Sequence, residues 1–290
     1  MTEPRLHDVM CLDSRGLHRM AYVEWGDTAN PKLLLCLHGL TRQGRDFDTL
    51  ARALAGEYRV VCPDVVGRGR SDWLADPMGY AIPQYVADMV TLLARLDART
   101  VDIVGTSMGG LIGMGLASLD NSPVRKLVLN DVGPVLQAQA LQRIGSYLGQ
   151  PARWDSLEQA ADALWAISQG FGPHSREQWL ALTAPQLKPD AEQGGFKPRS
   201  DPSIAVPFRA ITPELAAAGE ALLWRSYDRI RCPTLLLRGA ESDLLSRDTA
   251  QAMTQRGPGA RLHEFAGVGH APTLVQDEQI HVLSTFLLSP

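Results

Sequence analysis

Ser107 lies in the run Gly105-Thr106-Ser107-Met108-Gly109, where its hydroxyl could act as a nucleophile. The run follows an apolar, strand-like stretch at 101–104 and precedes a helix-like stretch, so the serine lies at a sharp turn from strand to helix. Such a turn imposes strained backbone angles on the serine, and the flanking glycines let the strand and the helix approach each other. The hydroxyl then projects alone from the turn.

His270 is the predicted base for this serine. A serine hydroxyl is a weak nucleophile, so it needs a nearby base whose tautomer is held by a third group. The small-residue run Gly267-Val268-Gly269 precedes His270 and follows a predicted strand at 261–265. That position is the carboxyl edge of a parallel sheet, the edge that also presents Ser107. No catalytic role is assigned to the other histidines: His7, His18, His38, His174, His263 and His281.

Two aspartates are candidates for the group that orients His270. Asp243 follows the predicted strand at 233–237 through the turn Gly239-Ala240-Glu241-Ser242. Asp131 follows the predicted strand at 125–129 and could also point at the imidazole. We favour Asp243, because the acid of a serine-acid-histidine order is expected on the later strand. Asp131 remains the alternative partner of His270. It could instead brace the hinge that leads into the segment after it.

Backbone amides are the expected donors to an oxyanion formed at Ser107. The amide of Met108 opens the helix after the serine, and the amide of Leu40 lies just past a buried strand in His38-Gly39-Leu40-Thr41. Losing one such donor costs about 100- to 1000-fold in rate. Leu40 and Met108 are therefore predicted to form the oxyanion hole through their N–H groups.

Three further side chains are candidates for substrate contact. Arg42 and Arg45 follow the oxyanion loop, and a guanidinium there could hold a substrate carboxylate through two parallel hydrogen bonds. Trp165 belongs to a tryptophan-rich region and could line an apolar pocket. We find no cluster of histidines and carboxylates with metal-ligand spacing, so neither a metal nor a cofactor is expected.

Strand-like and helix-like stretches alternate along most of the chain, which is typical of a mostly parallel sheet flanked by helices. The predicted strands are 17–25, 32–37, 58–62, 101–104, 125–129, 233–237 and 261–265. The predicted helices outside the interruption described next are 46–55, 84–96, 108–119, 247–255 and 275–287.

The alternation breaks between positions 134 and 227. This stretch is helical, then rich in proline and glycine between Pro185 and Pro213, then helical again, and it holds four of the six tryptophans. Aromatic helices and a long irregular loop suit a lid over an apolar pocket. We therefore divide the chain into a core of 1–133 and 228–290 and a mainly helical cap of 134–227.

Composition limits the class of partner. The chain has 290 residues with 45% hydrophobic content, enough to bury a large core, and a net charge of -4 with its positive charges scattered. Small molecules are therefore the expected partners, without nucleic acid or membrane, and a homo-oligomer is possible. The first residues lack the apolar stretch of a secretory signal, so we expect a soluble, cytoplasmic protein. Its four cysteines are predicted to be structural thiols.

Five motifs together resemble those of serine hydrolases with the α/β-hydrolase fold, and the resemblance covers nearly the whole chain. They are His38-Gly39, the run from Asp64 to Ser71, the run from Gly105 to Gly110, the run from Gly239 to Asp243, and the run from Gly267 to His270. The resemblance implies an α/β-hydrolase fold with an inserted cap. It implies Ser107 as nucleophile, His270 as general base and acid, and Asp243 as its partner, with Leu40 and Met108 as oxyanion donors.

The leading hypothesis is a carboxylesterase that acts through an acyl-Ser107 intermediate, with a broad range of short or medium acyl chains that extends to lactones and polyesters. A second hypothesis is a carbon–carbon bond hydrolase of aromatic degradation, an enol-lactonase or a perhydrolase on the same residues. A third is a ligand receptor without catalysis, since fold alone does not dictate function. The substrate itself is left open by the sequence.

Overall fold

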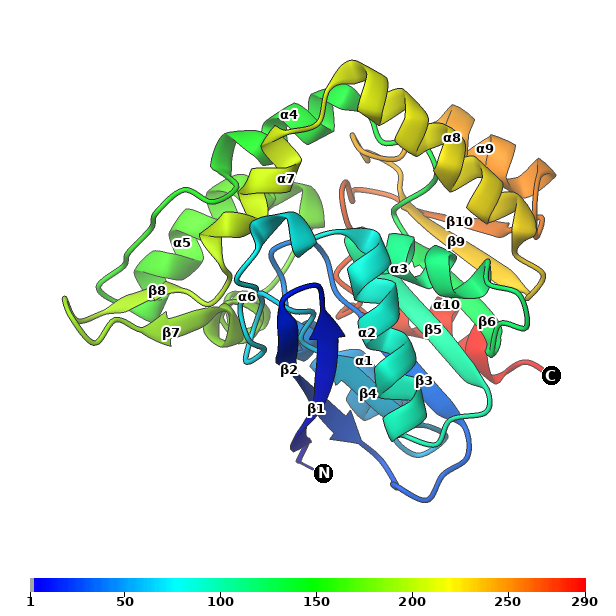
Figure 1. Cartoon of the computed structure of the whole chain (residues 1–290), viewed down its shortest axis with the longest axis horizontal. Helices are drawn as coiled ribbons and strands as arrows, with labels where there is room; N and C mark the ends of the chain where they lie inside the picture. The colour runs from blue at the N-terminus through cyan, green and yellow to red at the C-terminus, as the bar shows by residue number, and fades with distance from the viewer. Residues whose placement is uncertain (1–2) are drawn as a thin grey trace.

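An eight-stranded, mostly parallel sheet forms the centre of the molecule (Figure 1). The computed structural model describes residues 3–290. The strands of this sheet are β1 (Arg5–Asp13), β2 (Gly16–Trp25), β3 (Leu33–Leu37), β4 (Arg59–Pro63), β5 (Val101–Thr106), β6 (Val124–Asn130), β9 (Thr234–Gly239) and β10 (Arg261–Phe265). They lie in the order β1-β2-β4-β3-β5-β6-β9-β10, parallel from β4 to β10 and antiparallel at the β1 edge. The predicted fold class is confirmed.

Helices cover both faces of this sheet, which explains why the central strands are continuous apolar runs. In β3, Leu33, Leu35 and Leu37 join the core on one face, whereas Leu34 and Cys36 join the core on the other. The first face packs against α2 (Ile82–Arg95), α3 (Met108–Ala117) and α9 (Arg247–Gln255). The second packs against α1 (Asp48–Leu54) and α10 (Asp277–Leu288). All five helices were expected within a few residues of these bounds.

The first strand, β1, was not predicted from the sequence. Leu6, Met10 and Leu12 on it are exposed, so its hydrophobic pattern does not show a single buried face. The strand is specified by its antiparallel pairing with β2 through the short turn before Gly16. The chain also contains five short 3₁₀ helices within residues 3–290: η1 (Gly44–Phe47), η2 (Pro77–Gly79), η3 (Gln169–Phe171), η4 (Ala184–Gln186) and η5 (Pro202–Ile204).

Residues 134–227, here called the cap segment, connect β6 to β9. The segment contains α4 (Ala138–Tyr147), α5 (Leu157–Ser168), α6 (Arg176–Thr183), β7 (Leu187–Pro189), β8 (Phe196–Pro198), α7 (Ala205–Arg209) and α8 (Pro213–Arg229). The stretch from 185 to 213, expected as an irregular loop, includes the antiparallel β7–β8 ribbon and α7. In Figure 1 the ribbon projects to one side, while α4, α7 and α8 arch over the top of the view.

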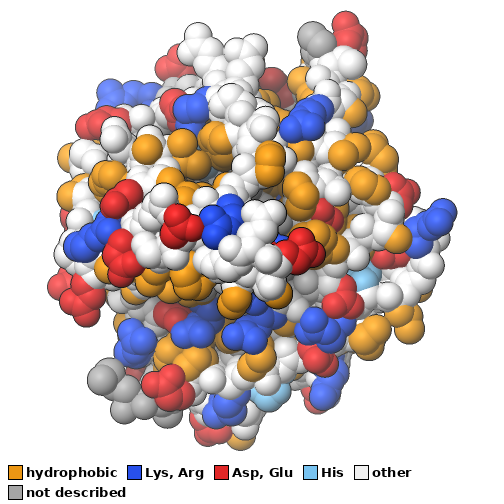
Figure 2. Space-filling model, turned by 90° about the vertical axis from the view of Figure 1, so that its left-hand side faces the viewer, with side chains coloured by type: hydrophobic (Ala, Val, Ile, Leu, Met, Phe, Trp, Pro, Cys, Tyr) orange, Lys and Arg blue, Asp and Glu red, His pale blue; other side chains and the backbone are white. Residues whose placement is uncertain are grey.

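Figure 2 shows the face on the side of the β7–β8 ribbon. Hydrophobic side chains gather across its upper half, and a row of basic side chains lower down has acidic side chains beside it. This face therefore carries both signs of charge. Within residues 3–290, no helix is long and apolar enough to span a membrane.

Candidate active site

Ser107 occupies the predicted strained turn between β5 and α3. Its backbone angles are φ 52° and ψ -118°, a conformation that side-chain-bearing residues rarely adopt. The close approach also requires glycine on both sides of the turn. A Cβ at Gly105 would lie 2.4 Å from the Gly109 carbonyl oxygen, and a Cβ at Gly109 would lie 2.0 Å from the Leu37 carbonyl oxygen. The strand, the turn and the helix thus hold Ser107 rigidly.

His270 lies beside Ser107 as expected. Its Nε2 is 3.0 Å from the Ser107 hydroxyl oxygen, and its Nδ1 is 2.7 Å from Oδ2 of Asp131. When Nδ1 carries the proton that it donates to Asp131, Nε2 is left to accept the serine proton. The loop of His270 is braced by Asn130, whose amide donates to the Pro272 carbonyl at 2.7 Å. The three side chains form a continuous hydrogen-bonded path from Ser107 to a buried carboxylate.

Asp131 is fully buried, and each of its carboxylate oxygens has a further donor. Oδ1 accepts the Gly239 amide at 2.9 Å, and Oδ2 accepts the Ser242 hydroxyl at 2.6 Å. These donors come from the end of β9, so the turn after that strand orients Asp131 rather than supplying the acid itself. Burying a carboxylate is costly unless its oxygens accept such hydrogen bonds.

The prediction that Asp243 partners His270 is wrong for this structure. The Asp243 carboxylate instead forms a two-point ion pair with Arg143 of α4, at 2.8 Å to Nε and 3.1 Å to Nη2, and 46% of its side chain is exposed. The chain order could not separate the two candidates, because Ser107, Asp131 and His270 follow the same serine-acid-histidine order as the set with Asp243.

The predicted oxyanion donors lie next to Ser107, and Leu40 lines the same cavities as the serine. A Cβ built at Gly39 would lie 3.8 Å from the Ser107 Cβ, so the loop before Leu40 faces the serine closely. Within residues 3–290 the amides of Leu40 and Met108 have no hydrogen-bond acceptor. Two N–H groups beside a nucleophile are suited to a developing negative charge.

His38 shapes this loop, and both of its ring nitrogens have partners other than the serine hydroxyl. Its Nε2 accepts the Val65 amide at 2.9 Å, and its Nδ1 lies 2.7 Å from the Gly39 carbonyl oxygen. Burial in the first place, together with the charges of Arg68 and Arg42, lowers the pKa of His38 to about 3. The imidazole is therefore neutral and acts as a fixed hydrogen-bonding link between two loops.

Arg68 is a second brace of the predicted oxyanion loop, and the sequence analysis named it only as part of the run from Asp64 to Ser71. The residue is fully buried. Its guanidinium donates to the Leu40 carbonyl at 2.8 Å, and Nη2 lies 3.5 Å from the Met108 sulfur. It also donates to the Tyr85 hydroxyl at 2.8 Å. Arg68 therefore contacts both residues whose amides face Ser107, and no signal in the sequence alone would have placed it there.

Two cavities meet at Ser107. The first, the His270 cavity, has a volume of about 120 Å³ and is lined by His270, by apolar side chains such as Leu164 and Phe171, and by polar side chains that include Arg143 and Tyr147. The second, the Met108 cavity, has a volume of about 260 Å³ and is lined almost entirely by apolar side chains. Core and cap segment contribute to both, so a substrate at Ser107 lies between them.

The structure treats the three predicted substrate contacts differently. Arg42 lines the His270 cavity, but its guanidinium already pairs with Asp46 through Nε and Nη2. Arg45 pairs with Asp48 and lines neither cavity. Trp165 also lines neither cavity and packs edge-on against Trp179, with ring centroids 5.0 Å apart. Of the three, Arg42 alone reaches the site, as a paired charge.

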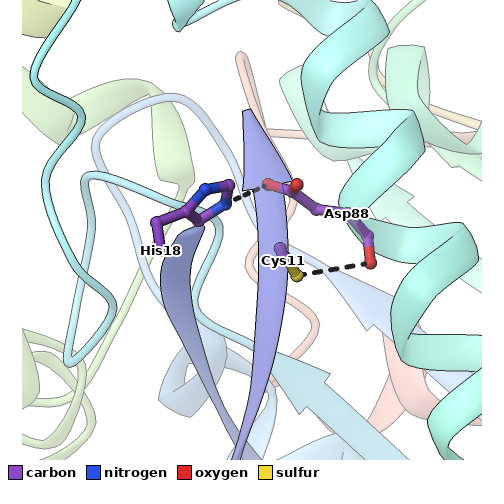
Figure 3. Close-up of side chains that lie close together, drawn as sticks. All are labelled: Cys11, His18 and Asp88. Carbon is purple, nitrogen blue, oxygen red and sulfur yellow. Dashed lines mark hydrogen bonds and ion pairs between the residues drawn. The ribbon is translucent and has the colours of Figure 1, made fainter. Parts of the chain in front are cut away.

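One group of potential metal ligands lies outside this site, between the β1–β2 hairpin and α2. Figure 3 shows Cys11, His18 and Asp88 together, and their ligand atoms lie within 4.8 Å of one another. The sequence did not suggest this group, because its members come from three segments. Both ring nitrogens of His18 face carboxylates: Nε2 lies 3.1 Å from Asp88 Oδ2, and Nδ1 lies 3.3 Å from Asp13 Oδ2. That arrangement suits a protonated imidazole and explains the cluster without a metal.

We expect His18 to contribute stability that depends on pH. Burial alone would lower the pKa of His18, but Asp88 and then Asp13 outweigh it and raise the pKa above its ordinary value of 6.5. A histidine whose pKa is raised in the folded state stabilises the folded state fully below pH 6.5, the unfolded-state pKa. This contribution to the free energy of unfolding is lost as the pH rises through the folded-state pKa. Burial raises the pKa of the Cys11 thiol to about 12, so that neighbour does not titrate here.

The measurement is urea unfolding of the wild type and His18→Gln across pH 5.5 to 9. We expect the variant to be less stable by about 1–3 kcal/mol at the acidic end, with the difference shrinking toward the alkaline end. A difference that stays constant with pH would contradict the charged state of His18.

Comparison with known proteins agrees with this architecture. The model of the family described as Alpha/beta hydrolase family matches residues 34–281. The chain is 58% identical over 285 residues to a 3-hydroxybutyrate-oligomer hydrolase from Cupriavidus necator, which covers 98% of this chain and 97% of that protein. It is 26% identical to a pimeloyl-[acyl-carrier protein] methyl ester esterase from Chromobacterium violaceum, over 84% of this chain and 89% of that protein.

A solved structure is similar over the same extent. The crystal structure of an alpha/beta hydrolase from Novosphingobium aromaticivorans superposes with a TM-score of 0.86 at 36% sequence identity, covering 99% of each chain. The likeness therefore includes the cap segment as well as the sheet. With the sheet order and the matched residues, these comparisons show that the chain belongs to the alpha/beta hydrolase family.

Proposed function

We propose that this ester hydrolase cleaves oligomers of 3-hydroxybutyrate, or of closely related 3-hydroxyacids, through an acyl-Ser107 intermediate. The observation that carries the proposal is the hydrogen-bonded path from Ser107 through His270 to Asp131, located where the two cavities meet. The substrate class is supported by the likeness to the 3-hydroxybutyrate-oligomer hydrolase, which extends over nearly the full length of both proteins.

The first half of the reaction forms the acyl-enzyme. The Ser107 oxygen attacks the ester carbonyl carbon while its proton moves to Nε2 of His270, and Asp131 stabilises the imidazolium that results. The carbonyl oxygen becomes an oxyanion, which accepts hydrogen bonds from the amides of Leu40 and Met108. When the carbon–oxygen bond to the alcohol breaks, His270 returns the proton to the leaving oxygen.

The second half repeats these steps with water. His270 takes a proton from a water molecule that attacks the acyl carbon, and it then gives that proton back to the Ser107 oxygen as the acyl bond breaks. The products are a hydroxyacid or shorter oligomer with a new alcohol, and a carboxylic acid. The apolar Met108 cavity suits the methyl-bearing backbone of such an oligomer, since its lining offers van der Waals contact and few polar competitors.

The test is to incubate the purified protein with linear 3-hydroxybutyrate dimer and trimer, beside a series of p-nitrophenyl esters of increasing acyl length. We expect release of 3-hydroxybutyrate, and labelling by an alkyl phosphonate that peptide mapping locates on Ser107. Inert oligomers would overturn the substrate proposal. Cleavage of a dienoate carbon–carbon bond with negligible ester turnover would instead favour the second hypothesis.

We also propose a role for the cap segment in this reaction. The cap segment acts as the lid that separates the acyl-enzyme from bulk water, because both cavities are enclosed partly by its helices. A cytoplasmic location and a homo-oligomeric state stay predictions from the sequence.

A further inference from the structure

The two cavities differ in which catalytic group each contains. His270 lines the His270 cavity and not the Met108 cavity, whereas Met108 lines the Met108 cavity and not the His270 cavity. His270 must give its proton to the leaving oxygen, so the alcohol part of the ester lies on the His270 side. Ser107 lines both cavities, so with the alcohol part on the His270 side the Met108 cavity is left for the acyl part. The geometry therefore gives the substrate a direction.

That direction places the charge of the substrate in the His270 cavity. When a linear 3-hydroxyacid oligomer is cut at its last ester bond, the leaving alcohol is a single hydroxyacid unit with a free carboxylate. Such an anion needs a cationic or hydrogen-bonding partner in the cavity that receives it. The acyl part, in contrast, is a neutral chain and matches the apolar lining of the Met108 cavity.

Two arginines line the His270 cavity, and their surroundings differ. Arg42 is held by Asp46 at 2.5 Å and 2.9 Å, and both side chains are mostly buried, so this charge is already neutralised. Arg143 pairs with Asp243, but 41% of the Arg143 side chain and 46% of the Asp243 side chain are exposed. Exposed ion pairs contribute little to stability, so a substrate carboxylate can compete with Asp243 for this guanidinium.

Arg143 also has a neighbour suited to the same ligand. Tyr147 follows one turn later on α4 and lines the same cavity. The ion pair with Asp243 uses Nε and Nη2 of Arg143, and Tyr147 is a further polar neighbour of the same guanidinium. Asp243 itself lines neither cavity. Arg143 thus lines the cavity that holds His270, while its ion-pair partner Asp243 lies outside both cavities.

We propose that Arg143, assisted by Tyr147, binds the terminal carboxylate of the leaving hydroxyacid, so that the enzyme shortens oligomers from their carboxyl end. This inference rests on the proposed function and adds the identity and direction of the unit released. Arg143 is in this role a specificity residue rather than a participant in bond breaking.

The first experiment compares the 3-hydroxybutyrate trimer with its methyl ester, which lacks the terminal charge. We expect the wild type to prefer the free acid by about tenfold in kcat/KM, and Arg143→Gln to lose most of that preference. Arg45→Gln is the matched control, because Arg45 is a comparably exposed, ion-paired arginine outside both cavities, and it should keep the preference.

Asp243→Asn should act in the opposite direction, because it removes the carboxylate that competes for Arg143. We expect a lower KM for the free acid and a larger preference over the methyl ester. A trimer with a ¹³C label in its hydroxyl-terminal unit should release unlabelled monomer first.

The outcomes separate the two proposals. A trimer that the wild type does not hydrolyse overturns the proposed function. A trimer that is hydrolysed without preference for the free acid, with an unchanged preference in Arg143→Gln, or with labelled monomer released first, overturns the carboxylate site and leaves the proposed function standing.

Discussion

Replacing Asp131 by asparagine is expected to lower kcat by about 10³- to 10⁴-fold, with a much smaller effect on KM. The side chain of asparagine has one oxygen that accepts hydrogen bonds, and its NH2 group only donates. It therefore cannot accept from His270 Nδ1 and also keep the bonds from Gly239 and Ser242 to two separate oxygens. The imidazole then loses its orientation and its tautomer, and the imidazolium formed during attack loses its negative partner. The measurement is steady-state hydrolysis of p-nitrophenyl butyrate.

Asp243→Asn is the matched control for that experiment, since it makes the same chemical change at the other aspartate that sequence reasoning considered. Its carboxylate contacts Arg143 and not His270, so kcat on this uncharged ester should stay within about twofold of the wild type. If Asp243→Asn instead abolished activity and Asp131→Asn did not, the assignment of the acid from this structure would be wrong.

The sequence could predict that Ser107 and His270 lie together, because each residue has a recognisable pattern of neighbours. Glycines flank Ser107 where a strained turn needs them, and a small-residue run precedes His270. The acid has no such local requirement. Asp131 and Asp243 both follow strands that end at the same edge of the sheet, and only the path of the turn after β9 decides which carboxylate reaches the imidazole.

The fold was predictable for a similar reason. Buried parallel strands such as β3 and β5 read as short apolar runs between helical patterns, so their existence and type follow from periodicity. The β1 edge strand, exposed on one side, leaves no such pattern. The contacts of Trp165, Arg68 and His18 depend on which distant segments fold over them, and periodicity along the chain contains no information about that.

Substitution of Arg68 is the second change for which we expect a large loss of kcat. A fully buried guanidinium that forms no ion pair with a carboxylate in residues 3–290 is costly, since desolvation penalises an unpaired charge strongly. Its donors are satisfied by neutral acceptors, namely the carbonyls of Leu40 and Val66 and the hydroxyl of Tyr85. The arginine is 5.1 Å from the centre of the Tyr85 ring, which adds a cation–π contact.

We expect Arg68 to stabilise the charged transition state of the reaction. Arg68 holds the Leu40 carbonyl and contacts the Met108 side chain, so it fixes the two residues whose amides we propose as donors to the oxyanion. A positive charge behind the oxyanion hole also favours the charged transition state over the neutral ester, and that effect is strong in a buried site. Arg68 is therefore a positioning residue whose loss should appear in kcat.

We expect Arg68→Met to lower kcat by about 10- to 100-fold with little change in KM, and Arg68→Lys, which keeps the charge but not the planar fork, to fall between the variant and the wild type. A trifluoromethyl ketone that forms a tetrahedral oxyanion adduct on Ser107 should lose affinity in parallel with kcat, whereas a non-reacting substrate analogue should not. If both inhibitors lost affinity equally, or kcat fell only as the folded fraction fell, Arg68 would serve the stability of the core and not the oxyanion.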